Sequence, residues 1–187
     1  MSKKLILLIG APGSGKTTDA KLIAQNHSEV ITSYSLGLLL RDEIEKGGKL
    51  GKIINGFLSK GDLVPTAIII DVICASVSHA PTDVVILDGF PRLQNQMKIF
   101  ADIVLDTNRA DLVSVIEIKV SDEVARERYF KDYEDEAIFE HSMSAYKSAI
   151  ADIETFYTDK HILQIVDGEQ SLEKVLEDTE KIIKSFI

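Results

Sequence analysis

The sequence has 187 residues and a mass of 20.7 kDa, a size that suits one domain built around one hydrophobic core. Hydrophobic residues make up 45% of the chain and charged residues 27%, which excludes an intrinsically disordered or low-complexity protein. The net charge of -9 argues against a general binder of nucleic acid or of anionic membranes, but it leaves room for a local phosphate pocket.

The first predicted strand is the uninterrupted apolar run 5–9, which is typical of a buried strand in a parallel sheet. This run is too short for a signal-peptide core or a membrane span, so we expect a cytoplasmic protein. A helix over 14–26 and a strand over 29–34 are predicted next. Three consecutive helices separated by glycines follow, over 38–46, 50–60 and 65–78.

The second half of the chain alternates strands with helices. Strands are predicted at 84–87, 112–120 and 162–166, and helices at 93–107, 122–130, 137–157 and 171–186. Ser121 is expected to cap the helix that begins at Asp122. This alternation predicts an α/β fold with a doubly wound, parallel, five-stranded sheet. The single cysteine, Cys74, excludes an intramolecular disulfide and a multi-cysteine zinc site, and we expect it to be a small buried residue.

Residues 10–17, Gly-Ala-Pro-Gly-Ser-Gly-Lys-Thr, fit the pattern of a phosphate-binding loop (P-loop). Its glycines allow backbone N–H groups to surround phosphate oxygens, and the helix that follows adds the positive end of its dipole. Lys16 can reach the β- and γ-phosphates, and the Thr17 hydroxyl can ligate Mg²⁺. The alternative is a glycine-rich turn with a solvated lysine, which the strand before the motif and the helix after it disfavour.

Asp88 ends the apolar run 84–87, at the carboxyl end of a predicted parallel strand. Ligands of open α/β sheets bind at this edge, and an aspartate there can hold Mg²⁺ directly or through water. The alternative is an aspartate that caps the following turn. A P-loop in the same chain favours the metal.

Several motifs in order resemble adenylate kinases. They are the P-loop, Gly61-Asp62-Leu63-Val64-Pro65, Asp88-Gly89-Phe90-Pro91-Arg92 followed by Gln96, and shorter matches at 39–41 and 166–168. The resemblance covers nearly the whole chain and looks most like the bacterial form with a short lid. It implies a single P-loop kinase domain over 1–187, with a nucleoside-monophosphate-binding helical insert at 34–78 and a lid at 129–136.

The resemblance also implies a reaction, since this family transfers the γ-phosphoryl group of Mg-ATP to AMP reversibly. The resemblance implies ATP, AMP and ADP as partners, with Mg²⁺ accompanying ATP. From the composition, charge and apolar runs we expect no zinc, no nucleic-acid partner and no membrane partner, and nothing in the sequence demands more than a monomer. The implied ATP-binding residues are Gly13, Ser14, Gly15, Lys16, Thr17, Thr18, Arg128 and Gln170. The implied AMP-binding residues are Gly37, Arg41, Val64, Gly89, Arg92 and Gln96. The implied catalytic residues are Lys16, Asp88, Arg92 and Arg128, with Thr17 and Asp88 at the metal.

The sequence departs from the family pattern in the lid. The chain has five arginines, which are Arg41, Arg92, Arg109, Arg126 and Arg128. Two of them, Arg109 and Arg126, are expected to be solvated. Lys131-Asp132 stands where the family usually has Gly-Arg in the lid. The family's later arginine, on the following helix, is replaced in this chain by Ser142 or Met143. Lys131 or Lys147 can supply charge there, but a lysine lacks the planar fork that binds phosphate bidentately. Impaired catalysis is therefore expected.

A second departure lies before Leu39-Leu40-Arg41, where the family usually has Thr-Gly-Asp and this chain has Leu36-Gly37-Leu38. The two leucines are expected to belong to the core, which leaves the acceptor base open. Two alternatives to an AMP kinase remain. One is a degenerate nucleotide-binding homologue with little or no catalysis that serves as a sensor or interaction module. The other is a P-loop kinase of a different small phosphate acceptor.

Overall fold

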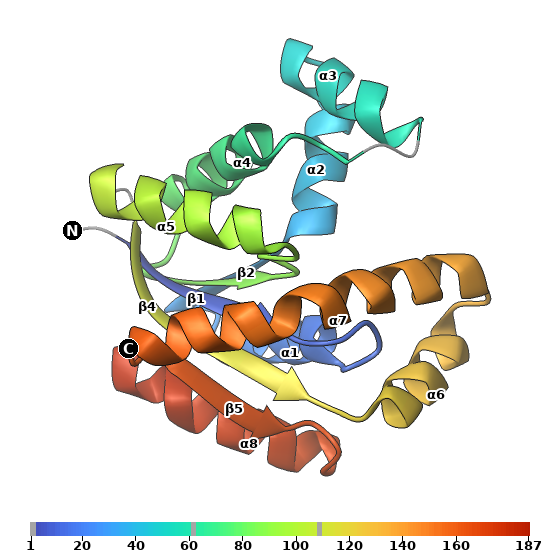
Figure 1. The fold of residues 1–187 in the computed structure, drawn as a ribbon. Helices are drawn as coiled ribbons and strands as arrows, with labels where there is room; N and C mark the ends of the chain where they lie inside the picture. The colour runs from blue at the N-terminus through green and yellow to red at the C-terminus, as the bar shows by residue number, and fades with distance from the viewer. Residues whose placement is uncertain (1–2, 61–62, 108–109) are drawn as a thin grey trace.

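The computed structural model describes residues 3–60, 63–107 and 110–187 (Figure 1). A five-stranded sheet with the strand order β2-β3-β1-β4-β5 forms its centre, and all four ladders are parallel. The strands are β1 (Lys3–Ile9), β2 (Ile31–Ser35), β3 (Val84–Asp88), β4 (Ala110–Lys119) and β5 (Leu163–Asp167). The predicted α/β fold with a doubly wound parallel sheet is confirmed.

The helices follow the predicted order. They are α1 (Lys16–Asn26), α2 (Leu36–Glu45), α3 (Lys49–Leu58), α4 (Thr66–Ser78), α5 (Gln94–Thr107), α6 (Asp122–Asp132), α7 (Glu136–Asp159) and α8 (Leu172–Ile183), with a 3-10 turn, η1 (Lys184–Phe186), after α8. The Ser121 side chain accepts a hydrogen bond from the Val124 backbone N–H at 3.4 Å, so the predicted cap of α6 is confirmed.

The charged segment 131–136 is more helical than the sequence suggested. Helix α6 continues to Asp132, and α7 already begins at Glu136. The Asp135 carboxylate accepts the backbone N–H of Ile138 at 3.0 Å, which caps the first turn of α7 and fixes its start. Residues 133–135 alone connect the two helices.

Both faces of the sheet are covered, which explains why the run 5–9 is apolar without alternation. Leu5, Leu7 and Ile9 pack with the buried side chains of α4, α5 and α7. Ile6 and Leu8 point to the opposite face, where they join the core formed with α1 and α8. Figure 1 shows α4 and α5 on one side of the sheet and α8 on the other.

Helices α2 and α3 project from the layer that covers the sheet, whereas α4 lies within that layer beside α5 (Figure 1). Close packing joins the projecting pair, because a Cβ at Gly51 would lie 2.0 Å from the Glu43 carbonyl oxygen. Helix α4 buries Ile70, Ile73 and Cys74 in the core of the sheet. Residues 34–78 thus contain one element that supports the sheet and two that reach away from it.

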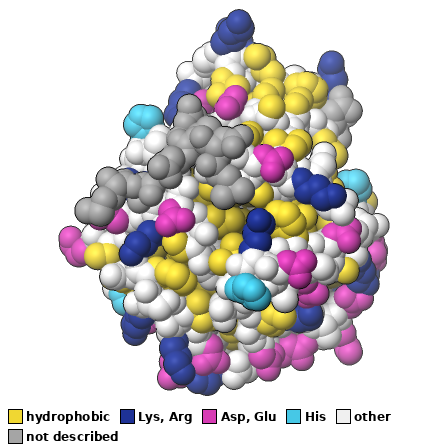
Figure 2. Space-filling model, turned by 60° about the vertical axis from the view of Figure 1, so that its left-hand side comes forward, with side chains coloured by type: hydrophobic (Ala, Val, Ile, Leu, Met, Phe, Trp, Pro, Cys, Tyr) yellow, Lys and Arg dark blue, Asp and Glu magenta, His cyan; other side chains and the backbone are white. Residues whose placement is uncertain are grey.

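The leucines of α2 occupy different environments. Leu36, Leu39 and Leu40 are buried because positions i, i+3 and i+4 share one face of a helix. Leu38 falls outside that face and is 54% exposed, so the expectation that it belongs to the core is wrong. Figure 2 shows hydrophobic side chains gathered at the end of the molecule formed by α2 and α3.

A membrane-spanning segment is not found among residues 3–60, 63–107 and 110–187, where no helix combines the necessary length and apolar character.

Candidate active site

The P-loop lies between the end of β1 at Ile9 and the start of α1 at Lys16. Gly13 has a φ of +83°, and a Cβ at this position would lie 2.1 Å from the Ala125 carbonyl oxygen. Only glycine therefore allows the loop to turn here while packing against the backbone of α6. Gly15 directly precedes α1 and has a φ of +93°. The helix therefore begins where the loop ends, and its N-terminus lies beside the loop.

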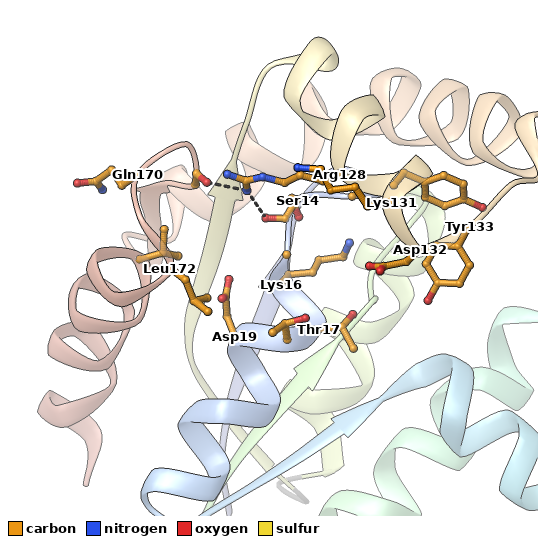
Figure 3. A pocket seen from close by; sticks show the side chains of 16 residues that line it. Ser14, Lys16, Thr17, Asp19, Arg128, Lys131, Asp132, Tyr133, Gln170 and Leu172 are labelled. Atoms are coloured by element: carbon orange, nitrogen blue, oxygen red, sulfur yellow. Dashed lines mark hydrogen bonds between the residues drawn. The ribbon is translucent and has the colours of Figure 1, made fainter.

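A cavity of about 460 Å³, called here the P-loop pocket, lies over this loop. Its lining comes from the loop and α1 (Gly13, Ser14, Gly15, Lys16, Thr17, Thr18, Asp19), from α6 and the turn after it (Arg128, Tyr129, Lys131, Asp132, Tyr133), from the segment after β5 (Gly168, Gln170), and from the first turns of α8 (Leu172, Val175). Figure 3 shows Asp132 directed toward the pocket on the side of Lys16 and Thr17.

Lys16 is folded back onto its own loop, where its Nζ donates a hydrogen bond to the Ala11 carbonyl oxygen at 3.0 Å. Burial lowers the pKa of the Lys16 ammonium, and the nearby charges of Asp88 and Arg92 act on it in opposite directions. A half-buried ammonium that has one backbone acceptor is suited to bind an anion that enters the pocket.

The side chains of Thr17 and Asp88 meet, since Thr17 Oγ1 donates to Asp88 Oδ2 at 2.5 Å. Asp88 is 3% exposed, and its Oδ1 has no hydrogen-bond partner among the residues that the structure describes. Carboxylate and hydroxyl oxygens are the ligand type that Mg²⁺ prefers, so this pair fits a magnesium ion. Since the described ranges hold no group of three or more His, Cys, Asp or Glu side chains that could bind a metal, the other ligands would be phosphate and water.

Arg128 bridges the P-loop and the segment after β5. Its Nη1 donates to the Gly168 carbonyl oxygen at 2.8 Å and to the Ser14 carbonyl oxygen at 3.4 Å (Figure 3). Gln170, predicted at the same site, donates from Nε2 to the Asp167 carbonyl oxygen at 3.1 Å and to Asp178 Oδ2 at 3.2 Å. Figure 3 shows the Gln170 side chain pointing away from the pocket, although the residue lines it.

Asp19 is a pocket residue that the sequence reasoning missed. It lies in the first turn of α1 and is 2% exposed, and its Oδ2 has no hydrogen-bond partner among the described residues. Burial raises the pKa of Asp19 to about 6, although the Arg128 guanidinium lowers it in part. In the sequence, an acidic residue in a first helical turn looks like an ordinary partner of the helix dipole, so nothing indicated burial.

A second cavity, of about 410 Å³, is called here the Arg92 cavity. Its lining comes from β1 and the P-loop (Ile9, Gly10, Pro12, Lys16), from Leu63, from the segment after β3 (Gly89, Phe90, Pro91, Arg92, Leu93), from Gln96 in the first turn of α5, and from α7 (His141, Ser142, Ala145, Tyr146, Ser148, Ala149, Ile150, Ile153). Lys16 lines both cavities, which therefore adjoin at its side chain.

The segment after β3 is held by its own side chains. Gln96 is buried, and its Oε1 accepts the backbone N–H groups of Arg92 at 2.8 Å and of Leu93 at 3.3 Å. Arg92 Nε donates to the Gly89 carbonyl oxygen at 3.0 Å. The amide oxygen of Gln96 is thus engaged in the start of α5, so a contact with a ligand falls to the amide nitrogen.

Three predicted acceptor residues, Gly89, Arg92 and Gln96, line the Arg92 cavity, and three others, Gly37, Arg41 and Val64, do not. Arg41 is exposed on α2, and the Val64 side chain is buried in the core. The motif residues Gly61 and Asp62, and Arg109, lie outside the described residues.

The residues that stand in place of the family's arginines, or that could replace their charge, lie in different environments. Ser142 lines the Arg92 cavity and Met143 is buried, so Ser142 is the one of the two that reaches a cavity. Lys147 pairs with Asp122 and lines neither cavity. Lys131 lines the P-loop pocket and pairs with Glu127 at 3.0 Å.

Arg126 is exposed, as expected, and it also joins α6 to α7. Its guanidinium pairs with Glu136 and Glu140 and lies 5.0 Å from the ring centre of Phe130 and 5.5 Å from that of Phe139. The α6–α7 corner is thus fixed by ion pairs and aromatic packing, without arginines directed at either cavity from Tyr129–Glu136.

Comparison with known proteins gives one consistent family. The family model described as adenylate kinase matches residues 8–162. A protein named adenylate kinase from Sulfurovum sp. (strain NBC37-1) is 45% identical over 196 residues, which cover 99% of this chain and 100% of that protein. Adenylate kinases from Helicobacter hepaticus and Wolinella succinogenes are each 44% identical, covering 97% and 98% of this chain and 98% of each relative.

Proposed function

Because the chain belongs to the adenylate kinase family and is therefore a nucleoside monophosphate kinase, we propose that it transfers the γ-phosphoryl group of Mg-ATP to AMP in a reversible reaction. The observation that carries the proposal is that Lys16 lines both cavities. Phosphates bound in the two cavities would meet at one ammonium group, as a direct transfer between two nucleotides requires.

ATP occupies the P-loop pocket in this proposal. Its phosphates lie against Gly13 to Thr18, at the N-terminus of α1, where unpaired N–H groups and the helix dipole favour anions. Arg128 lies at the wall nearest Ser14 and Gly168 and contacts the ATP, and Gln170 and Leu172 lie toward the nucleoside.

Thr17 and Asp88 hold the Mg²⁺ that accompanies ATP, through the unpartnered Asp88 Oδ1 and the Thr17 hydroxyl. When bound, this ion neutralises charge on the phosphate oxygens and orients the γ-phosphate. Asp88 also keeps Thr17 in place, so one carboxylate positions both the metal and the first turn of α1.

AMP occupies the Arg92 cavity, with its phosphate toward Arg92 and its base toward Gln96. Gly37, Arg41 and Val64 belong to residues 34–78, the nucleoside-monophosphate-binding insert of this proposal. Helices α2 and α3 project away from the sheet, so Arg41 reaches the acceptor phosphate when the insert moves toward the cavity (Figure 1). Residues 129–136 form the lid on the ATP side.

The transfer itself needs positioning and neutralisation of charge more than a covalent nucleophile. Lys16 and Arg92 line the same cavity, so two cationic side chains are available where the two cavities adjoin. Burial is the main cause of the lowered pKa of Lys16, and the nearby Arg92 charge adds to it against that of Asp88. Catalysis is slow in this proposal because Asp132, a carboxylate, faces the P-loop pocket and Ser142 faces the Arg92 cavity.

The test is a coupled assay of ADP formation from Mg-ATP with AMP, CMP, UMP and GMP in turn, combined with calorimetric titration of ATP. Transfer to AMP above the other acceptors supports the proposal. ATP binding without transfer to any acceptor would instead support the second candidate, a nucleotide-binding protein without catalysis. The observation that favours this candidate is the Asp132 carboxylate in the P-loop pocket.

A further inference from the structure

A buried acidic side chain lies beneath the Arg92 cavity. Glu117 is on β4, is 0% exposed, and has Ile9 of β1 and Ile165 of β5 as its neighbours in the sheet. The Tyr146 hydroxyl, on α7, donates a hydrogen bond to Glu117 Oε1 at 2.9 Å. Glu117 takes no part in the nucleotide contacts described above.

A second carboxyl group, that of Glu154 on α7, lies within hydrogen-bonding reach of Glu117. Lys119 Nζ donates to Glu154 Oε1 at 2.7 Å, while Glu117 Oε2 is buried and has no donor among the described residues. Two carboxylates are both acceptors, so Glu117 and Glu154 can hydrogen-bond only when one of them carries a proton.

The environment places that proton on Glu117. Burial, and then the contact with Glu154, raises the pKa of Glu117 to about 7, against the Tyr146 hydrogen bond and the Lys119 charge. Burial alone would raise the pKa of Glu154, but its hydrogen bonds with Lys119 and Glu117 outweigh this and lower it. At a pH below about 7, Glu117 is therefore largely protonated and can bridge Tyr146 and a charged Glu154.

Tyr146 connects this proton to the nucleotide site, because it also lines the Arg92 cavity. Ser142 and Ala145, one turn and one residue before it on α7, line the same cavity. We propose that Glu117 and Tyr146 are positioning residues of the acceptor site: protonated Glu117 holds α7 against β4 and keeps the α7 wall of the Arg92 cavity in its binding geometry. This inference rests on the proposed function, since it takes that cavity as the AMP site.

Loss of the Glu117 proton places two negative charges side by side under the cavity wall. The ionisable groups around them are Lys119 on β4, Glu154 and Tyr146 on α7, and the exposed Asp122–Lys147 pair near Tyr146. Lys119 is the cation that faces both carboxylates, and it is already bonded to Glu154. Repulsion and desolvation then weaken the contact between α7 and β4, and AMP binds less tightly.

The first measurement is the AMP dissociation constant by calorimetry at about pH 6 and about pH 8, for the wild type and for Glu117→Gln, which keeps the shape and stays neutral. The phosphate of AMP titrates in the same pH range and changes the affinity of both proteins. The informative quantity is therefore the AMP dissociation constant of the wild type divided by that of the variant at each pH. We expect this ratio to rise by about threefold or more between the two pH values. A constant ratio would overturn the inference.

Tyr146→Phe and Tyr157→Phe form a matched pair of variants on the same helix. Tyr157 is buried and its hydroxyl has no hydrogen-bond partner among the described residues, so its loss should leave AMP affinity and its pH dependence unchanged. Tyr146→Phe should weaken AMP binding at both pH values and reduce the pH dependence. Equal behaviour of the two variants would contradict the positioning role.

Amide hydrogen exchange of α7 residues 141–150 without nucleotide gives an independent readout. After correction for intrinsic rates, exchange should be faster at the higher pH in the wild type and not in Glu117→Gln. If ADP forms from AMP while the affinity ratio and the exchange stay constant, the inference fails and the proposed function stands. If AMP binds at neither pH, the acceptor role of the pair fails together with the proposed function.

Discussion

Thr17 and Asp88 are 71 residues apart in sequence, and a hydrogen bond of 2.5 Å joins the Thr17 hydroxyl to the Asp88 carboxylate. This bond ties the first turn of α1 to the end of β3. The second oxygen of Asp88 is buried without a partner among the described residues. A buried carboxylate oxygen in this state suits a bound cation, and Mg²⁺ with its water shell fits it.

Asp88→Asn tests the proposed metal site. The amide keeps the shape and removes the charge that attracts Mg²⁺, so turnover should fall by at least ~10-fold and more magnesium should be needed for half-maximal rate. The measurement is a magnesium titration of ADP formation at saturating ATP and AMP. An unchanged magnesium dependence would place the metal elsewhere.

Arg92→Lys tests the proposed contact of Arg92 with the phosphate of the acceptor. A lysine keeps the positive charge but cannot bind a phosphate bidentately, so KM for AMP should rise more than KM for ATP. Because Arg92 Nε also donates to the Gly89 carbonyl oxygen, the melting temperature should be recorded alongside. Equal changes in both KM values would show that Arg92 does not discriminate between the two nucleotides.

Asp19→Asn tests the buried carboxylate in the P-loop pocket. The pKa of Asp19 is raised from its ordinary value of 3.8 to about 6, so the folded state binds a proton more tightly than the unfolded state. Its contribution to the free energy of unfolding is therefore greatest at low pH and is lost as the pH rises from about 4 to about 6. The wild type should be less stable than the variant by about 1–2 kcal/mol above that window, with little difference near pH 4.

Chemical denaturation of both proteins at a series of pH values measures this difference. Glu117 titrates in an overlapping window, so the comparison of Asp19→Asn with the wild type isolates Asp19 from it. A stability difference that does not vary with pH would mean that Asp19 is ionised at its ordinary pKa.

Asp132→Arg and Ser142→Arg together test the account of the lid. Arginines at phosphoryl-transfer sites contribute ~10³–10⁵ in rate, and these two positions line the two cavities. We expect turnover to rise by about an order of magnitude or more in the double variant. Lys147→Arg is the control, since Lys147 pairs with Asp122 outside both cavities. No gain in the double variant, or a wild-type rate already typical of fast kinases, would refute the account.

Local features of the sequence were enough to predict the sheet and the place of the P-loop and Asp88 within it. The apolar run 5–9 is buried because helices cover both of its faces, and the P-loop motif followed it directly. Asp88 was recognised because it ends a buried strand, at the edge where ligands of parallel sheets bind. These features depend on residues that are adjacent in the chain.

Features that depend on distant packing could not be predicted in the same way. Asp19 and Glu117 look like ordinary surface acids in the sequence, and their burial follows from contacts with α6 and α7. Leu38 was expected in the core and is exposed, because its helical face is opposite to that of Leu39 and Leu40. Which of Ser142 and Met143 lines a cavity depends on the orientation of α7, which the sequence alone does not give.

The central claim is that phosphates bound in the two cavities meet at Lys16. The most direct test is the rate of ADP formation from Mg-ATP and AMP by the wild type, Lys16→Ala and Lys21→Ala, with melting curves for all three. Lys21 is an exposed lysine on the same helix and serves as the control. The account predicts ADP formation by the wild type and Lys21→Ala, and its loss in a folded Lys16→Ala. Equal rates in all three proteins, or no ADP formation by the wild type, would contradict it.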